Sequence, residues 1–465
     1  MRKVISVSVL LALAAPLGAY ADPSSDVEAL RREFENVKAD YETRLRALEQ
    51  RVKAAEAAAA AAPAASAAAA PPPVAAASPP PTSGAASASG GGGGFNPALS
   101  LILSGTYART SRDPANYRIH GFQLPPDAEI GPGTRGFSLA ESELGFAASI
   151  DPYWRGAANI SILPDNTVSI EEAFVQTTSL GNGLSLKAGR FFSGVGYLNS
   201  QHSHVWDFVD APLAYQAMLG TQFNDDGVQL TWLAPTEHFI ELGLELGRGR
   251  SFPGSDTNRN GAGMSAITAH TGGDIGESHS WRAGVSVLNA KAVDQALSAL
   301  ESAGSSVTNA FTGSTRVWVL DGVWKWAPNG NATRTNFKLQ GEYLRSTRTG
   351  SLVADVSGAA IADSARAAQS GWYLQGAYQF IPHWRVGLRT ERLNPGSPNF
   401  GINTALFAGD GFHPHKNSVM VDYSPSEFSR VRLQLARDNA RDGRADNQLF
   451  IQYQMSLGAH GAHSF

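Results

Sequence analysis

The stretch that decides the fold lies near the end of the chain, Leu449-Phe450-Ile451-Gln452-Tyr453-Gln454-Met455-Ser456-Leu457, and the chain finishes on Phe465. Leucine, isoleucine, tyrosine and methionine alternate here with phenylalanine, glutamine and serine. Successive side chains of a strand point to opposite faces, so one face is apolar and the other is mostly polar. Such a strand suits a sheet that has an apolar medium on one side and a polar medium on the other.

Composition limits the classes of protein that remain. The chain has 465 residues, 48 glycines, no cysteine and a formal net charge of −4, with a mean hydropathy of −0.18. Beyond the N-terminus no segment reaches about 18 consecutive apolar residues, which excludes a helical membrane protein, whereas a barrel spans lipid with half its residues polar. The lack of cysteine excludes a disulfide scaffold and thiolate metal sites. The near-neutral charge gives no support for a nucleic-acid partner.

The N-terminus has the pattern of a secretory signal peptide. Arg2 and Lys3 precede an apolar run from Val4 to Leu17, and Ala19-Tyr20-Ala21 supplies a small-x-small cleavage site. We therefore expect residues 1–21 to be removed and the mature chain to begin near Asp22. The alternative is an uncleaved anchor, for which the run is short.

Residues 22–56 are predicted to form a coiled-coil helix in the periplasm. Apolar residues recur at three- and four-residue steps at Val27, Leu30, Phe34, Val37, Tyr41, Leu45, Leu48, Val52 and Ala55. Such a narrow seam is buried by pairing with copies of itself, so we expect self-association through residues 26–56. A three-stranded core tolerates the aromatic residues, so a trimer is expected, although the pattern leaves the number open. The alternative is a single amphipathic helix on another surface.

Two further regions follow the helix. Residues 57–94 are rich in Ala, Pro, Ser and Gly, and this composition predicts a linker. Residues 95–465 are predicted to form an all-β transmembrane barrel of about 16 antiparallel strands. Tight turns are expected at Asp151-Pro152, Gly181-Asn182-Gly183, Pro235-Thr236, Gly276-Glu277, Pro328-Asn329-Gly330, Ile381-Pro382 and Ser424-Pro425. Longer connections are expected near 110–136, 163–166, 194–224, 250–261, 290–313, 347–369, 394–415 and 438–445. Segregated loop lengths are typical of a barrel and not of a sandwich.

Charged residues at alternate strand positions predict a wet interior. A dry core would not tolerate them, but a water-filled lumen does. The residues that parity predicts to line the pore are Glu141, Glu143, Glu172, Glu241, Glu245, Lys338, Arg385, Arg389, Arg430 and Arg432. Acids on one wall and bases on another would set a transverse field that orients dipolar solutes. The alternative is a solvated lumen surface without solute preference.

The connection 194–224 is the candidate constriction loop, with His202, His204, Asp207 and Asp210 as its functional residues. His202, His204 and Asp207 are also a candidate metal site, since two imidazoles on one side of an extended segment and a nearby carboxylate suit zinc. The alternative is that these histidines only form hydrogen bonds. No cofactor is required. No catalytic motif is found, so we do not expect an enzyme.

Several stretches resemble a bacterial family named zinc-regulated, TonB-dependent outer-membrane receptors. They are Phe95-Asn96-Pro97-Ala98-Leu99-Ser100-Leu101-Ile102-Leu103, Asn199-x-x-His202-x-His204-x-Trp206-Asp207-Phe208, Trp324-Lys325-Trp326-Ala327-Pro328-Asn329-Gly330 and Ser456-Leu457-Gly458-Ala459-His460-Gly461-Ala462-His463. The terminal strand resembles the closing strand of outer-membrane barrels, and the fold resembles porins of the phosphate-selective type. The resemblance implies an outer-membrane barrel over residues 95–465, zinc as ligand or substrate, and an energy-coupling partner. Such receptors carry a plug, whereas residues 22–94 hold only a helix and a spacer, which favours passive transport.

The leading hypothesis is a porin-like outer-membrane channel for passive uptake of small polar solutes, with metal ions or their chelates as candidates. It would sit in outer-membrane lipid and associate with like subunits through its periplasmic helix. One alternative is a zinc-binding receptor that captures metal with His202, His204 and Asp207. Another is a structural tether in which residues 22–94 reach peptidoglycan and the barrel is the anchor.

Overall fold

The computed structural model describes residues 97–178, 180–258, 260–302, 304–407, 411–441 and 443–458. The predicted signal peptide (1–21), coiled-coil helix (22–56) and linker (57–94) lie outside the described residues, as do His460, His463 and Phe465. Within the described part no helix is both long and apolar enough to cross a membrane.

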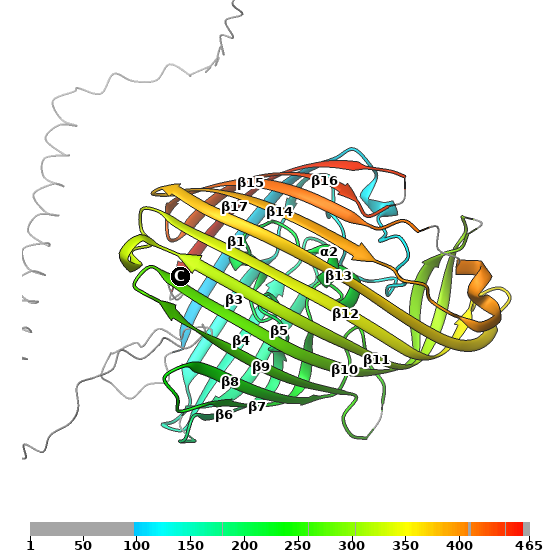
Figure 1. Ribbon diagram of the computed structural model, residues 1–465, viewed down its shortest axis with the longest axis horizontal. Coiled ribbons are helices and arrows are strands. Elements are labelled where there is room, and N and C mark those ends of the chain that lie inside the picture. The colour runs from blue at the N-terminus through cyan, green and yellow to red at the C-terminus, as the bar shows by residue number, and fades with distance from the viewer. Residues whose placement is uncertain are drawn as a thin grey trace, which may run out of the picture. The chain divides into compact units, whose positions relative to one another are not determined.

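The wall is one antiparallel sheet that closes on itself (Figure 1). Its strands are β1 (Ala98–Thr110), β2 (Gly136–Leu139), β3 (Ser142–Ser149), β4 (Trp154–Ile162), β5 (Val168–Thr177), β6 (Leu184–Phe192), β7 (Asn224–Leu233), β8 (Phe239–Gly247), β9 (Met264–Ile275), β10 (His279–Leu300), β11 (Ser306–Trp326), β12 (Asn336–Ala354), β13 (Ile361–Ile381), β14 (Trp384–Asn394), β15 (His415–Ser426), β16 (Ser429–Asn439) and β17 (Asp446–Gly458). The short helices are η1 (Pro114–Asn116), η2 (Ser203–Val205), α2 (Leu213–Leu219), η3 (Pro328–Gly330) and η4 (Gly401–Phe407).

The last strand closes the barrel against the first. β1 pairs with β17 from Ser100↔Gly458 to Thr110↔Gln448, and on its other side it pairs with both β2 and β3. These two pieces therefore share one position in the wall, and the 17 named strands make a 16-stranded barrel. The predicted strand number and closure are confirmed.

The two faces of the wall have the predicted polarity. On β17, Tyr453 is 49% exposed and Met455 54% exposed on the outside, whereas Phe450 is 1% exposed on the inside. On β14, Leu388 is 68% exposed and its neighbour Arg389 only 3%. Arg432 is also buried inside. The arginines thus avoid hydrocarbon, where an unpaired charge would be costly.

Two predicted loops are wrong because they are strands. Residues 290–313 lie mostly in β10 and β11, which meet at a short turn, and residues 347–369 lie mostly in β12 and β13. These stretches are rich in Ser, Thr, Ala and Gly, which are common in loops. Alternation nevertheless continues, and the inward side chains of these hairpins pack on Phe400 and form the cluster Ala292, Leu297, Phe311, Leu352 and Ala365. A strand of 21 residues spans ~70 Å, more than a membrane requires, so both hairpins extend beyond the lipid on the loop side.

One predicted turn is displaced by a few residues. Ser424-Pro425 lies inside β15, and the turn to β16 is formed by residues 427–428. The pairing of β15 with β16 shifts register between Tyr423 and Ser426. A proline has no N–H to donate to the ladder, and the irregularity accommodates it without ending the strand.

The interior of the barrel contains a packed core. Every residue of α2 is buried, and α2 contacts β12, β13 and β14. Its cluster includes inward residues of the wall, among them Val317, Val319 and Leu344, and residues of the β1–β2 connection such as Ile119. The connection between β6 and β7, residues 193–223, therefore lies inside the wall; we call it the lumen loop.

Candidate functional site

The lumen loop enters the barrel with its backbone donors satisfied by wall carboxylates. Glu245 accepts hydrogen bonds from the Ser193 hydroxyl (2.5 Å) and the Gly194 N–H (2.8 Å). Glu342 accepts from the N–H groups of Tyr197 (3.2 Å) and Leu198 (2.9 Å). Buried N–H groups need such partners, and a carboxylate is a strong acceptor. The wall thus specifies where the loop turns.

Glycine is required at this turn. Gly196 has φ +70°, and a Cβ there would collide with the Glu342 carboxylate and the Tyr215 hydroxyl. Tyr215 in α2 itself donates to Glu342 at 2.8 Å. A side chain at position 196 would therefore push the loop off its wall contact.

Asn199 joins the two ends of the lumen loop. Its fully buried amide nitrogen donates to the carbonyls of Ser193 and Phe223, both at 2.8 Å. Its amide oxygen accepts from the Phe223 N–H at 2.7 Å. One side chain thus replaces three ladder-type bonds where the loop leaves and rejoins the wall.

The loop meets an acidic wall through its two histidines. His202 Nδ1 lies 3.1 Å from Glu171 and 3.2 Å from Glu143, and its Nε2 lies 3.0 Å from Glu172. His204 Nδ1 lies 3.1 Å from the same Glu143 oxygen. Burial opposes a charge on His202, but the surrounding carboxylates outweigh it and raise the pKa of His202 well above its ordinary value. This contact is an ionic one.

The loop meets a basic wall through its two aspartates. Asp207 is paired with Lys338 and, at 3.1 Å, with Arg385. Asp210 is paired with Lys416 at 2.6 Å and Arg389 at 2.8 Å. Although burial opposes ionisation, the paired cations hold the pKa of both aspartates well below its usual range. The lumen loop therefore places its two histidines against the carboxylates of one wall and its two aspartates against the lysines and arginines of the other.

The ten residues predicted to line the pore fall into two groups. Glu143, Glu172, Glu245, Arg389 and Arg432 are buried, the first four in contact with the lumen loop. Arg432 instead forms a two-bond pair with Asp422, at 2.7 and 3.1 Å. Glu141, Glu241, Lys338, Arg385 and Arg430 keep partial exposure.

The predicted metal site needs one correction. His202 and His204 do come together, with ring centroids 5.5 Å apart. Asp207 does not join them, because the chain crosses the lumen after η2 and places its carboxylate between Lys338 and Arg385 on the opposite wall. Glu143 takes the place that Asp207 was expected to fill.

Sequence reasoning missed Glu171 and Lys416. The pairing of β4 with β5 shifts register next to Glu172, so the bulge turns two successive glutamates inward, which parity alone forbids. Lys416 lay one residue beyond a predicted loop, although it shares its parity with Ser418 and Asp422 and could have been found that way.

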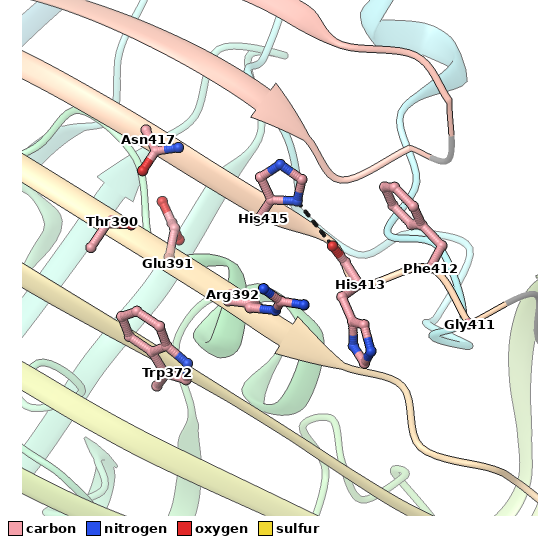
Figure 2. Close-up of a pocket in the computed structure, with 9 residues that line it drawn as sticks. All are labelled: Trp372, Thr390, Glu391, Arg392, Gly411, Phe412, His413, His415 and Asn417. Atoms are coloured by element: carbon pink, nitrogen blue, oxygen red, sulfur yellow. Dashed lines mark hydrogen bonds between the residues drawn. The ribbon is translucent and has the colours of Figure 1, made fainter.

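A second histidine pair is arranged differently. His413 and His415 line a surface pocket with Trp372 and Arg392. Figure 2 shows the two rings pointing in different directions, and His415 Nδ1 is bonded to the His413 carbonyl at 3.0 Å. These imidazoles do not converge on a common point.

The part of the lumen near the short turns carries a set of bases. Partly exposed, inward-facing cations occur within the first four residues of strands that leave short turns and at the end of β11. We call this set, Arg155, Lys187, Arg282, Lys325, Lys338, Arg385 and Arg430, the turn-side basic ring. Glu241 occupies the equivalent place on β8. Lys325 and Lys338 are direct partners across β11 and β12, and Arg282 lies over the Tyr197 ring at 5.4 Å.

A closed 16-stranded barrel with a loop folded into a charged lumen defines an outer-membrane protein of the porin class. The family described as phosphate-selective porin O and P matches residues 151–393, more than half of the chain, and the chain belongs to that family. The family assignment supports the porin part of the resemblance noted above and not a TonB-dependent zinc receptor.

Individual relatives have been compared as well. An uncharacterized protein of Aquifex aeolicus (strain VF5) is 30% identical over 400 residues, which cover 80% of each chain. An anion-selective porin from Comamonas acidovorans is 11% identical with a TM-score of 0.47, covering 78% of this chain and 100% of that one. The outer-membrane channel DcaP of Acinetobacter baumannii is 13% identical with a TM-score of 0.44, covering 78% and 98%.

Proposed function

We propose that this protein is a passive outer-membrane channel that favours small anions, including the phosphate for which its family is named. The turn-side basic ring carries the proposal. It places seven partly exposed cations on the inner wall. Lys338 and Arg385 are paired with Asp207, but Glu143, Glu172 and Glu245 are buried against the lumen loop, so cations are in excess on the exposed surface. Low-dielectric walls with an excess of one sign of charge focus the field and concentrate counter-ions.

The position of the lumen loop is evidence that the solute route past the turn-side basic ring is narrow. The loop is tied to both walls by ion pairs and packs α2 against β12, β13 and β14. Solutes are then selected by charge and width, with no covalent step. Metal ions or their chelates, considered above as solutes, fit this basic ring less well than anions do.

The test is ion selectivity of the purified protein in planar bilayers. A salt gradient should give stepwise conductance with a reversal potential of the anion-selective sign, and phosphate should reduce the chloride current by competing for the ring. A Lys325→Gln, Arg282→Gln variant should lose part of the anion preference. The matched control is Glu241→Gln on β8, which should increase it. Cation selectivity of the wild type, or equal shifts in both variants, would contradict the proposal.

We further propose that three such barrels associate through residues 26–56, as the apolar spacing of that segment suggests. Deleting residues 26–56 should lower oligomer mass in detergent and leave single-channel conductance unchanged. Intact oligomers that never conduct would instead favour the tether to peptidoglycan.

A further inference from the structure

We propose that Glu143, His202 and His204 bind a divalent transition-metal ion that fastens the lumen loop to the acidic wall. The three side chains offer donor atoms that all lie within 4.8 Å of one another. The imidazole rings are nearly parallel, with 21° between their planes. Both Nδ1 atoms approach the same oxygen, Glu143 Oε2, at 3.2 and 3.1 Å.

The environment of the shared oxygen, Glu143 Oε2, is a second observation in favour of a metal site. Glu143 is 6% exposed, and its Oε2 is enclosed beside two ring nitrogens that pair with it by charge but are not aligned for a regular hydrogen bond. Buried carboxylate oxygens normally accept such a bond. This oxygen is directed between the two imidazoles instead of along an N–H bond, which is the arrangement of donors around a common point.

The spacing suits a tetrahedral ion. Bonds of about 2.0–2.1 Å to zinc hold neighbouring donor atoms roughly 3.3–3.4 Å apart. The two oxygen-to-nitrogen distances of 3.2 and 3.1 Å need only a slight expansion. Two imidazoles and one carboxylate form a donor set that zinc and cobalt accept, and they leave a fourth position for water or a solute.

The surroundings support this assignment. The other ring nitrogen of His202 faces Glu172 at 3.0 Å, so this carboxylate can orient the ring as supporting carboxylates do at metal sites. Glu141 and Glu171 form a second close group with Glu143. Two imidazoles cannot balance four clustered carboxylates, of which Glu143 and Glu172 are buried, whereas a divalent ion adds positive charge to this wall.

The ligands come from two parts of the fold. Glu143 belongs to β3, whereas His202 and His204 belong to the lumen loop. An ion held by all three links the loop to the wall, and its binding free energy adds to the stability of the docked loop. The site therefore provides a way for metal to regulate the width of the route past the loop. This regulatory role rests on the proposed channel function; the metal site does not.

The test uses the full-length protein in detergent, freed of metal by a chelator and titrated with Zn²⁺ by calorimetry and with Co²⁺ by visible absorption. One equivalent of Co²⁺ should give the intense absorption bands of tetrahedral coordination, and Zn²⁺ should displace it. His202→Ala, His204→Ala should abolish both signals. The His413→Ala, His415→Ala double variant is the matched control and should bind as the wild type does.

Two further variants keep the test valid if the double histidine variant does not fold. Glu143→Gln keeps the shape of the ligand and should abolish the tetrahedral bands. Glu172→Gln removes only the supporting carboxylate and should weaken binding roughly 10–100-fold. Equal affinity in the wild type and in the His202, His204 variant, or failure of folded wild type to bind Co²⁺, would overturn the proposal. Metal binding is measured by calorimetry and absorption and not by conductance. Failure of the metal-site proposal is therefore distinguishable from failure of the proposed channel function.

Discussion

The two walls that hold the lumen loop differ in how completely their charges are matched. On the basic wall five cations, Lys338, Arg385, Arg389, Lys416 and Arg432, are paired with five carboxylates, those of Asp207, Asp210, Glu391, Asp422 and Asp438. On the acidic wall Glu141, Glu143, Glu171 and Glu172 cluster around the imidazoles of His202 and His204, and Lys187 lies near Glu172.

This difference assigns separate roles to the two walls. A balanced buried network is rigid, and removing one member leaves a charge that no proton at neutral pH can cancel, because arginine does not deprotonate. An unbalanced cluster of carboxylates can take up a proton or a metal ion instead. The basic wall therefore fixes the loop, and the acidic wall adjusts how firmly it is held.

The largest effect is expected on the basic wall. Asp210→Ala leaves Arg389 and Lys416, whose side chains are each 1% exposed, without their shared partner. Breaking a buried pair in this way costs about 3–5 kcal/mol. Chemical unfolding followed by tryptophan fluorescence measures the loss. The matched control is Asp256→Ala, which removes the exposed partner of Arg248 and should cost less than about 1 kcal/mol. Equal losses in the two variants would show that the basic wall does not fix the loop.

A smaller effect is expected on the acidic wall. His202→Ala removes the group that three carboxylates contact. The remaining acids can relieve their repulsion by binding protons, so the loss should be about 1–3 kcal/mol, the range for a buried polar partner. The same unfolding assay, in the presence of chelator, gives the comparison. A loss larger than that of Asp210→Ala would reverse the roles assigned to the two walls.

The fold could be predicted from the sequence because the alternation of apolar and polar residues is a local pattern. Alternation along β17 and along β14 is visible residue by residue, and closure with an even strand number follows from it. The long hairpins were not accessible. Whether Ser306–Gly313 is strand or loop depends on its pairing with β10 and β12, and that pairing is a non-local property.

The site was accessible only in part. Charge parity placed acids and bases on different walls, and His202, His204, Asp207 and Asp210 were recognised as a set. Which wall each residue meets depends on the path of the chain through the lumen, and that path is set by the Glu342 contacts and the Asn199 clamp. The bulge that turns Glu171 inward had no signature in the period-two pattern.

The smallest effect is expected from mild acid, and it tests the balance of the basic wall. Because the pKa values of Asp207 and Asp210 are depressed in the folded state, their contribution to stability is fully present above the unfolded value of about 3.9 and is lost only as pH falls below it. Between pH 7 and pH 5 the basic wall should therefore hold the loop unchanged. Limited proteolysis, with mass spectrometry of the fragments, reports cleavage within residues 193–223.

Cleavage in that segment should stay constant down to about pH 4 and rise below it. Asp210→Asn serves as the comparison, since its side chain cannot be protonated and the acid-dependent step should shrink. A midpoint near pH 6 in the wild type would contradict the prediction, because neither aspartate titrates there. Protonation of His202 could not explain it, since the carboxylates around His202 favour its charged form and acid therefore strengthens that contact.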